Sequence, residues 1–344
     1  MNQKIYNLPF ISIILACRNE EKHIDHCLKS LLNQNYPQSK MELLVIDGLS
    51  DDQTVKIIKN YAKQYPIIKF FSNPQKITSA AFNLGIQNAQ GELIILAGSH
   101  SIYPPNYIKK CVMASIKYRA DNVGGIIQAR PSANTIIAEA IAISLAHPFG
   151  AGNAYFRLSP PKIRWVDTVF GGCYHCSIFK KIGFFNENLV RSQDIEFNLR
   201  LKRAGGKILL IPDIISYYYP KDNLKDFFIH NFRDGIWIIY PFKFVKIPLS
   251  PRHYLPLCFI LGFLTTGILG IFWPIYFRLF LLMIAFYCLI GLFFGLQTAL
   301  KQKRAGYIVL LPLAFAVRHF GYGLGSLYGL INFLNYENKK TKRN

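Results

Sequence analysis

Two long apolar stretches in the last third of the chain limit what it can fold into. Tyr254–Trp273 contains no charged residue, and Ile275–Leu300 contains one, Arg278, near its end. About twenty helical residues rise roughly 30 Å, the thickness of the hydrocarbon layer of a membrane, and an arginine near a helix end can extend its charge to the interface. A pair of buried core helices is the alternative, but stretches this long and apolar are rare in soluble cores. We therefore expect membrane spans at about residues 254–273 and 275–300.

A third apolar segment, at about residues 306–334, is less uniform. Arg318 and His319 interrupt it, and glycines recur along it. Basic residues cluster on both sides of it, and such clusters favour the cytosolic side of a membrane. The clusters contain Lys301, Lys303, Arg304, Lys339, Lys340, Lys342 and Arg343. Both basic clusters can be cytosolic only if the segment between them crosses the membrane an even number of times or re-enters it. A single tilted span is simpler but breaks the charge rule, so we favour a re-entrant segment.

The overall composition excludes several classes of protein. Forty Lys and Arg against nineteen Asp and Glu give a net charge of +21, with 51% hydrophobic and 15% aromatic residues. This apolar content excludes a disordered chain, and seven cysteines are too few for a disulfide scaffold. The basic residues are scattered, without an arginine-rich arm, so we expect no nucleic-acid partner. An anionic membrane surface or an anionic substrate accounts for the charge.

The amino-terminal segment does not predict an export signal. Its apolar stretch, Phe10–Ala16, is short and continues into Cys17-Arg18-Asn19-Glu20 rather than into a small-residue cleavage site. We interpret it as a buried strand. We expect residues 1–245 to form a cytosolic domain and residues 246–344 to form a membrane domain.

Up to residue 245, short apolar stretches alternate with helical patterns. The expected strands are Ile11–Ala16, Leu43–Ile46, Ile67–Phe71 and Leu93–Ala97, and the expected helices are Asn19–Asn33, Asp52–Tyr65 and Thr78–Gln90. Strands that are apolar throughout and joined by helices predict an α/β fold with a mostly parallel sheet and helices on both faces. Ligands of such sheets bind at the carboxyl ends of the strands.

Polar residues follow the first two expected strands. The first ends Ala16-Cys17-Arg18-Asn19-Glu20, and the second continues as Asp47-Gly48-Leu49-Ser50-Asp51-Asp52-Gln53-Thr54. A carboxylate there can accept hydrogen bonds from ribose hydroxyls or a base N–H. Asp47 could instead shape a turn, and Asp52 is better explained as a helix cap. Neither common Gly-rich phosphate loop is present, which argues against dinucleotide oxidoreductases and P-loop NTPases.

Taken together, the motifs over about residues 8–240 resemble glycosyltransferase family 2, whose nucleotide-sugar domain has the GT-A fold. Residues 47–54 match that family's stretch after the second strand. Further segments look like its succinoglycan-biosynthesis branch: Asn73-Pro74 with Thr78 and Asn83-Leu84-Gly85-Ile86, Tyr103-Pro104-Pro105-Asn106-Tyr107, residues 166–173 and residues 193–200. The resemblance implies a nucleotide diphosphate sugar as donor. The implied donor-binding residues are Ala16, Arg18, Glu20, Asp47, Asn83, Ser99 and His100.

One stretch departs from the family pattern. The family usually has Asp-x-Asp, or Asp-Ala-His in this branch, after the fourth strand, where these side chains hold Mg²⁺ or Mn²⁺ on the diphosphate. Here the stretch is Ala97-Gly98-Ser99-His100-Ser101, with Gly98 in the place of the first aspartate. The resemblance implies a divalent metal and leaves His100 as its ligand, although one imidazole suits a hard cation poorly. A loop histidine without a ligand is an equal alternative.

A second acidic pair, Asp194 and Glu196, opens a helix-like segment that ends before Gly205-Gly206. A carboxylate at the amino end of a helix stays ionised because of the helix dipole and can accept a proton. Sugar transfer to a hydroxyl needs such a base, although Asp194 could instead be a simple N-cap. The family's inverting enzymes have their base at the position of Asp194, so the resemblance makes Asp194 the catalytic base and Glu196 a supporting acid.

The segment His230–Trp237, before the membrane part, is basic and aromatic. It resembles a segment that closes over the diphosphate or the sugar in relatives, which makes Arg233 and Trp237 supporting residues near the acceptor. An amphipathic stretch at the membrane interface is an equal alternative. The apolar segment Thr135–Ala146 either covers the sheet or lies against the bilayer.

These observations predict a membrane-anchored inverting glycosyltransferase. It would move a sugar from a nucleotide diphosphate sugar to a lipid-linked saccharide in polysaccharide biosynthesis. The alternatives are a transferase that acts directly on polyprenyl phosphate, and a non-catalytic sugar-binding or scaffold protein, because Gly98 leaves the metal motif incomplete. The expected location is the cell membrane, with several crossings and a cytoplasmic catalytic domain.

Overall fold

The computed structural model describes residues 8–245 and 249–341, and the chain divides into two compact units. The first contains residues up to 128 together with 159–218, and the second contains residues 129–158 and those from 219 onward. Two segments that we expected in the first domain, residues 135–146 and 230–237, therefore belong with the apolar helices instead.

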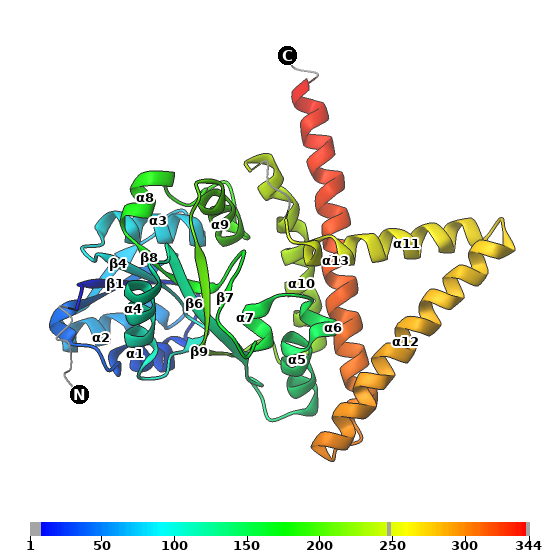
Figure 1. The fold of residues 1–344 in the computed structure, drawn as a ribbon, viewed down its shortest axis with the longest axis horizontal. Helices are drawn as coiled ribbons and strands as arrows, with labels where there is room; N and C mark the ends of the chain where they lie inside the picture. Colours follow the sequence, from blue (N-terminus) through cyan, green and yellow to red (C-terminus); the bar gives the residue numbers. More distant parts are fainter. Residues whose placement is uncertain (1–7, 246–248, 342–344) are drawn as a thin grey trace. The chain divides into compact units, whose positions relative to one another are not determined.

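The first unit is built on a sheet whose first half is parallel (Figure 1). The strand order among the described residues is β3-β2-β1-β4-β8-β6-β9-β5, and β7 pairs with β9. β1 pairs in parallel with β2 and β4, and β2 pairs in parallel with β3. β8 pairs antiparallel with β4 and β6. The strands are β1 (Ile11–Cys17), β2 (Met41–Asp47), β3 (Ile68–Ser72), β4 (Leu93–Gly98), β5 (Ser101–Ile102), β6 (Asn122–Ala129), β7 (Arg164–Trp165), β8 (Phe170–His175) and β9 (Ile208–Tyr218).

Helices cover both faces of this sheet, as the apolar strands predict. α1 (Ile24–Leu32), α2 (Thr54–Gln64) and α4 (Tyr107–Tyr118) share one buried cluster with alternate residues of β1 such as Ile13. α3 (Thr78–Asn88) packs on the opposite face, where a side-chain carbon at Gly85 would lie 2.4 Å from the Ile14 side chain. Glycine is required there because α3 lies so close to β1.

The remaining helices of this unit are α8 (Ser177–Ile182) and α9 (Gln193–Arg203), and a short 3₁₀ turn, η1, covers Gln38–Lys40. The four expected strands and the expected helices are present, with ends that differ by a few residues. The largest difference is at α1, which begins at Ile24 rather than at Asn19. Asn19 has φ +56°, a left-handed conformation that an α-helix does not contain.

The second unit is helical. Its helices are α5 (Ile136–Ala146), α6 (Pro148–Ala151), α7 (Tyr155–Leu158), α10 (Leu224–Ile239), α11 (Leu255–Gly270), α12 (Pro274–Gln302) and α13 (Tyr307–Thr341), with 3₁₀ turns η2 (Tyr240–Lys243) and η3 (Pro251–His253). α11 and α12 form a hairpin that projects away from α13, and α10 lies beside α13 (Figure 1).

The contact between α10 and α13 depends on small residues. Gly321, Gly325 and Gly329 recur at every fourth position on the face of α13 that meets α10. A side-chain carbon at Gly325 would lie 2.0 Å from the carbonyl oxygen of Phe232, and one at Gly235 would lie 2.1 Å from a carbonyl oxygen of α13. The two backbones therefore approach as closely as in small-residue helix pairs of membranes.

The three expected apolar segments differ in length as helices. α12 and residues 307–333 of α13 are the described helices that are long and apolar enough to cross a membrane. α11 has 16 residues and rises about 24 Å. It is shorter than the apolar stretch because Pro256 occupies its first turn and the helix ends at Gly270, four residues before α12 begins at Pro274. The re-entrant segment that we favoured is wrong: residues 307–341 form one continuous helix, without the break at which a re-entrant chain turns back.

Candidate functional site

A cavity of about 320 Å³ lies at the carboxyl ends of β1 and β4. The loop between β3 and α3 forms a second side, and residues of β8 and β9 complete it. It is lined by Ala16, Cys17, Arg18, Glu20, Gly48, Asn73, Lys76, Ile77, Thr78, Ala81, Phe82, Ala97, Gly98, Ser99, His100, Ser101, Phe170 and Tyr218. This is the edge of a parallel sheet where a ligand is expected.

Five of the seven expected donor-binding residues line this cavity: Ala16, Arg18, Glu20, Ser99 and His100. These residues lie at or directly after the carboxyl ends of β1 and β4, which are neighbouring parallel strands. The strands end level with each other, because Ala16 of β1 pairs with Gly98 of β4. Their roles in binding remain predictions, but the sequence placed them together correctly.

Glu20 and His100 form a polar pair in the cavity. Nε2 of His100 lies 2.9 Å from Oε1 of Glu20, and the His23 ring meets the His100 ring edge-on at 4.9 Å. The backbone N–H of Glu20 donates to the Thr54 hydroxyl at 2.7 Å. Glu20 is 8% exposed, and its Oε2 is buried without a hydrogen-bond partner. The cavity therefore has a carboxylate held in place with one acceptor oxygen still to be satisfied.

Asp47 is 1% exposed and has local partners. Its carboxylate accepts the backbone N–H of Ser50 at 3.0 Å and the Ser50 hydroxyl at 2.5 Å. It therefore shapes the turn after β2, as one interpretation of the sequence expected, and the next residue, Gly48, lines the cavity. A contact between Asp47 and the nucleotide stays a prediction. Asp52 accepts the N–H of Thr54, the first residue of α2, at 2.9 Å, but the N-cap position itself is Gln53, one residue later than the sequence indicated.

Asn83, the other expected donor-binding residue outside the cavity lining, connects two segments. Its Oδ1 accepts the Phe185 N–H at 2.9 Å, and its Nδ2 donates to the Phe185 carbonyl at 2.9 Å and to Glu187 at 2.7 Å. These contacts fix α3 to the segment before α9. Its role in donor binding stays a prediction.

Asp194 and Glu196 lie in different environments. Asp194 is the second residue of α9 and is half-buried, while the N-cap position is occupied by Ser192. Asp194 is therefore not the N-cap, but it does lie in the first turn, where the helix dipole stabilises its charge. Glu196 is 1% exposed, and Arg200 donates to both its oxygens, at 2.6 and 2.9 Å.

Arg200 extends the contacts of Glu196 to the backbone. It donates to the carbonyls of Ile182 and Phe184, at 2.5 and 2.7 Å. The Glu196–Arg200 pair therefore fixes the segment before α9, and both oxygens of Glu196 are engaged. The supporting role expected for Glu196 stays a prediction.

Arg233 and Trp237 belong to α10 in the second unit. Arg233 is exposed, and the Trp237 ring packs on Tyr240 with centroids 4.9 Å apart. Their expected role near the acceptor stays a prediction.

Most of the residues that line the cavity were not among the expected site residues. Examples are Lys76, Thr78, Phe170 and Tyr218. Thr78 belongs to a motif noted in the sequence, and Lys76 follows Asn73-Pro74 in that motif. Phe170 lies in the motif at residues 166–173, but that motif did not point to this cavity. Tyr218, at the end of β9, belongs to no motif noted in the sequence.

The residues of this cavity do not fit the paired-carboxylate metal site that the resemblance implies. Of the described residues that line it, Glu20 has the only carboxylate, and one of its oxygens is engaged with His100. Cys17 also lines the cavity, but burial raises the pKa of its thiol, which keeps it protonated and a poor ligand. Within the described residues, no group of three His, Cys, Asp or Glu side chains is placed to hold a metal ion.

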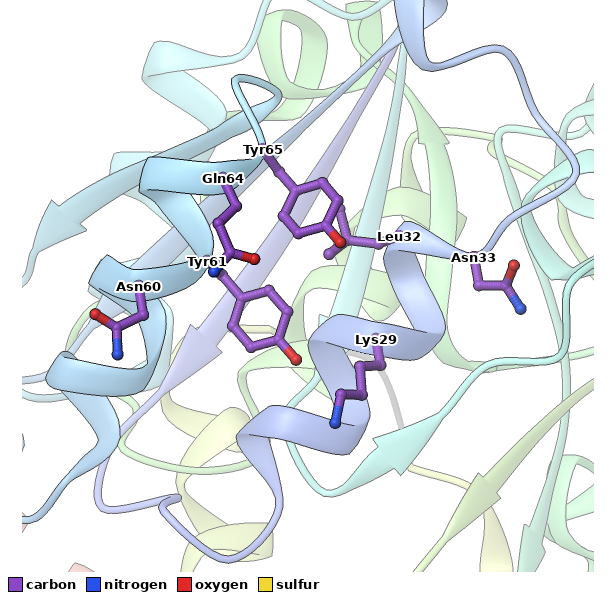
Figure 2. A pocket seen from close by; sticks show the side chains of 7 residues that line it. All are labelled: Lys29, Leu32, Asn33, Asn60, Tyr61, Gln64 and Tyr65. Carbon is purple, nitrogen blue, oxygen red and sulfur yellow. The ribbon is translucent and has the colours of Figure 1, made fainter.

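A second hollow, of about 490 Å³, lies between α1 and α2 (Figure 2). It is lined by Lys29, Leu32, Asn33, Asn60, Tyr61, Gln64 and Tyr65. The Tyr61 hydroxyl donates to Asp25 at 2.7 Å, and the Tyr61 ring stacks on Tyr65. The lining residues belong to α1, α2 and the positions directly after these two helices. Ligands of a parallel sheet bind at the carboxyl ends of its strands, so this hollow is a less favourable ligand site than the strand-end cavity.

The mostly parallel sheet with helices on both faces is a GT-A-like fold, the fold of nucleotide-sugar transferases. Residues 12–184 match the family described as Glycosyl transferase family 2, and the chain belongs to this family. It is a glycosyltransferase by this membership.

Two curated relatives and one solved structure illustrate the similarity. The chain is 30% identical over 318 residues to a dolichyl N-acetyl-alpha-D-glucosaminyl phosphate 3-beta-D-2,3-diacetamido-2,3-dideoxy-beta-D-glucuronosyltransferase of Methanococcus voltae, covering 84% of this chain and 98% of that protein. It is 26% identical to the succinoglycan biosynthesis protein ExoA of Rhizobium meliloti, covering 65% and 67% of the two chains.

The solved structure is the mannosyltransferase PcManGT from Pyrobaculum calidifontis in complex with GDP-Man and Mn²⁺. It aligns with a TM-score of 0.56 at 18% identity, covering 90% of this chain and 87% of that one. At this identity, the likeness supports the GT-A fold alone.

Proposed function

We propose that this protein is a membrane-anchored inverting glycosyltransferase that moves a sugar from a nucleotide diphosphate sugar to a lipid-linked saccharide. The observation that carries the proposal is the Methanococcus voltae relative, which this chain matches over 98% of its length and whose name describes transfer to a dolichyl-linked sugar phosphate. The strand-end cavity offers a place for the donor, and the apolar helices of the second unit offer a means of holding the enzyme beside a lipid-linked acceptor.

In the proposed reaction, the acceptor hydroxyl attacks the anomeric carbon of the donor sugar. The bond between that carbon and the β-phosphate oxygen breaks, and the nucleoside diphosphate leaves with the electron pair. The hydroxyl proton passes to the carboxylate of Asp194, which is half-buried in the first turn of α9. A single displacement of this kind inverts the anomeric carbon.

We further propose that the α11–α12 hairpin is the part that enters the membrane. Its tip is apolar and exposed, with Ile271, Phe272 and Trp273 exposed by 78%, 68% and 53%. Exposed apolar side chains continue along α12, including Leu282 and Phe286. Such continuous apolar exposure fits lipid rather than water.

In this proposal α13 stays at the cytosolic surface. It packs closely along α10, whose charged residues, such as Asp226 and Arg233, disfavour the hydrocarbon layer. If α13 does not cross the membrane, the basic clusters near its two ends lie on the same, cytosolic side, as the charge rule requires. The catalytic unit, which precedes α11, then lies on the cytosolic side too.

Thiol labelling of sealed inside-out vesicles tests this topology. In a background without Cys258 and Cys288, which are exposed, Lys303→Cys should react with an impermeant maleimide and Trp273→Cys should react only after the vesicles are opened. The reverse pattern would contradict the proposed orientation.

Sugar transfer is tested with membranes that contain the protein, a panel of nucleotide sugars, and three acceptor conditions. These are a polyprenyl diphosphate-linked monosaccharide, polyprenyl phosphate and no lipid. Product on the first acceptor, absent with Asp194→Asn, supports the proposal. Product on polyprenyl phosphate alone would replace it with direct transfer to the lipid phosphate, and no transfer from any donor would refute it.

A further inference from the structure

Two side-chain cations face the proposed donor cavity from different segments. Arg18 follows β1, and Lys76 lies in the loop between β3 and α3; both line the cavity and are exposed. Neither has an ion-pair partner among the residues that the structure describes. Glu20, the carboxylate of the cavity, is engaged with His100 instead. The two cations therefore remain available to a ligand.

The loop that carries Lys76 is held by several hydrogen bonds. Asn73 is 3% exposed, and its side chain accepts the Gln75 N–H at 3.1 Å and donates to the Ile77 carbonyl at 2.9 Å. Lys76 itself donates its backbone N–H to the Asn73 carbonyl at 3.2 Å and has φ +61°. A left-handed backbone is unfavourable for lysine, so the loop holds this residue in place at an energetic cost.

The amino end of α3 adds positive potential to the same side of the cavity. Ile77 is its N-cap, Thr78 is its first residue, and both line the cavity. Ile77 provides no side-chain cap, so the first N–H groups of this eleven-residue helix lack the usual side-chain acceptor. A helix end of this kind attracts phosphate groups.

An aromatic ring lies beside the position of the missing carboxylate. A side-chain carbon at Gly98 would lie 3.3 Å from Cζ of Phe170, and the Gly98 N–H donates to the Tyr103 hydroxyl at 2.7 Å. The space where the family has its first aspartate is therefore apolar on one side, and the cations Arg18 and Lys76 line the same cavity.

We propose that Arg18, Lys76 and the amino end of α3 bind and neutralise the diphosphate of the donor in place of a divalent metal held by paired carboxylates. This rests on the proposed function, since it requires a nucleotide diphosphate sugar as the donor. As the bond to the anomeric carbon breaks, charge grows on the β-phosphate oxygen, and fixed cations stabilise it. The unpartnered Oε2 of Glu20 accepts a hydrogen bond from a hydroxyl group of the same ligand.

Calorimetry of the full-length protein in detergent with UDP and GDP tests this assignment. For the nucleotide that binds, we expect its affinity to change less than twofold between EDTA and 1 mM Mn²⁺. Lys76→Gln and Arg18→Gln should each weaken binding by about 10-fold or more, because each removes a charge-assisted contact. Lys56→Gln, which removes an exposed charge on α2 outside the cavity, is the matched control and should change affinity less than twofold.

The corresponding nucleoside separates loss of the diphosphate contact from loss of the fold. Lys76→Gln should leave nucleoside affinity within twofold of wild type, whereas a distorted cavity would weaken nucleoside and nucleotide alike and refute the assignment. Nucleotide binding that requires Mn²⁺, or that is unchanged in both charge variants, would also overturn it while leaving the proposed function intact. Failure of both UDP and GDP to bind, with and without Mn²⁺, would instead remove the donor site on which the proposed function depends.

Discussion

Replacing Asp194 with asparagine tests the proposed base most directly. Asparagine preserves the shape of the side chain but cannot accept the acceptor proton. A positioned base contributes about 10²–10⁴-fold to a rate, so we expect kcat for transfer to fall by that factor. Nucleotide affinity should remain within a few-fold, because the base acts in the transition state rather than in donor binding.

A structural effect of the same substitution would be much smaller. Asp194 is in the first turn of α9 but is not its N-cap, so the change weakens its interaction with the helix dipole. That interaction is worth about 0.3–1 kcal/mol, which is roughly a two- to fivefold effect on an equilibrium. It cannot account for a loss of two orders of magnitude.

The assay is steady-state transfer across a range of pH, with Asp213→Asn as the control. Asp213 is an exposed carboxylate on β9, outside the cavity lining, and its replacement should leave kcat unchanged within twofold. In the wild type, activity should fall at acid pH as the base becomes protonated, and Asp194→Asn should lose this dependence. Near-normal kcat with an unchanged pH profile in Asp194→Asn would refute our assignment of the base.

Three other substitutions or treatments have defined outcomes. Asp47→Ala should weaken nucleotide diphosphate binding by about 1.5–3 kcal/mol in calorimetry if the carboxylate contacts the nucleotide; an equal loss in Ser50→Ala would assign the effect to the turn that Asp47 holds. Gly98→Asp restores one carboxylate and should make donor turnover more sensitive to EDTA than in the wild type; equal sensitivity would show that this position does not govern metal use. The protein should stay in the membrane pellet after washing with about 1 M salt, which screens surface charges, and its release would rule out insertion of the α11–α12 hairpin.

Local periodicity was sufficient to predict the first half of the sheet. Strands such as Ile11–Cys17 are apolar throughout, and their connecting helices have a clear apolar face, so both the elements and the strand-end site could be inferred. Residues directly after a strand, such as Arg18 and Glu20, were placed correctly because their position depends only on where that strand ends.

Residues whose role depends on a distant partner could not be predicted in the same way. The sequence does not show that the Phe170 ring lies beside Gly98, or that Asn83 binds the backbone at Phe185. Likewise, the apolar pattern of α13 indicated a membrane segment, whereas its contact with α10 depends on matched glycines in two separate helices. Pairing of this kind is a property of the assembled unit, not of either segment.

The close contact between α10 and α13 has a consequence for the order in which the chain is made. α10 ends at Ile239, but its partner begins only at Tyr307, beyond the whole α11–α12 hairpin. During synthesis, α10 therefore emerges with one face uncovered and must wait until the hairpin has been produced. In the topology proposed above, the hairpin would enter the membrane before the glycine face of α13 meets α10 at Gly235. A chain that ends before residue 307 lacks α13 and therefore leaves uncovered the face of α10 that contains Gly235.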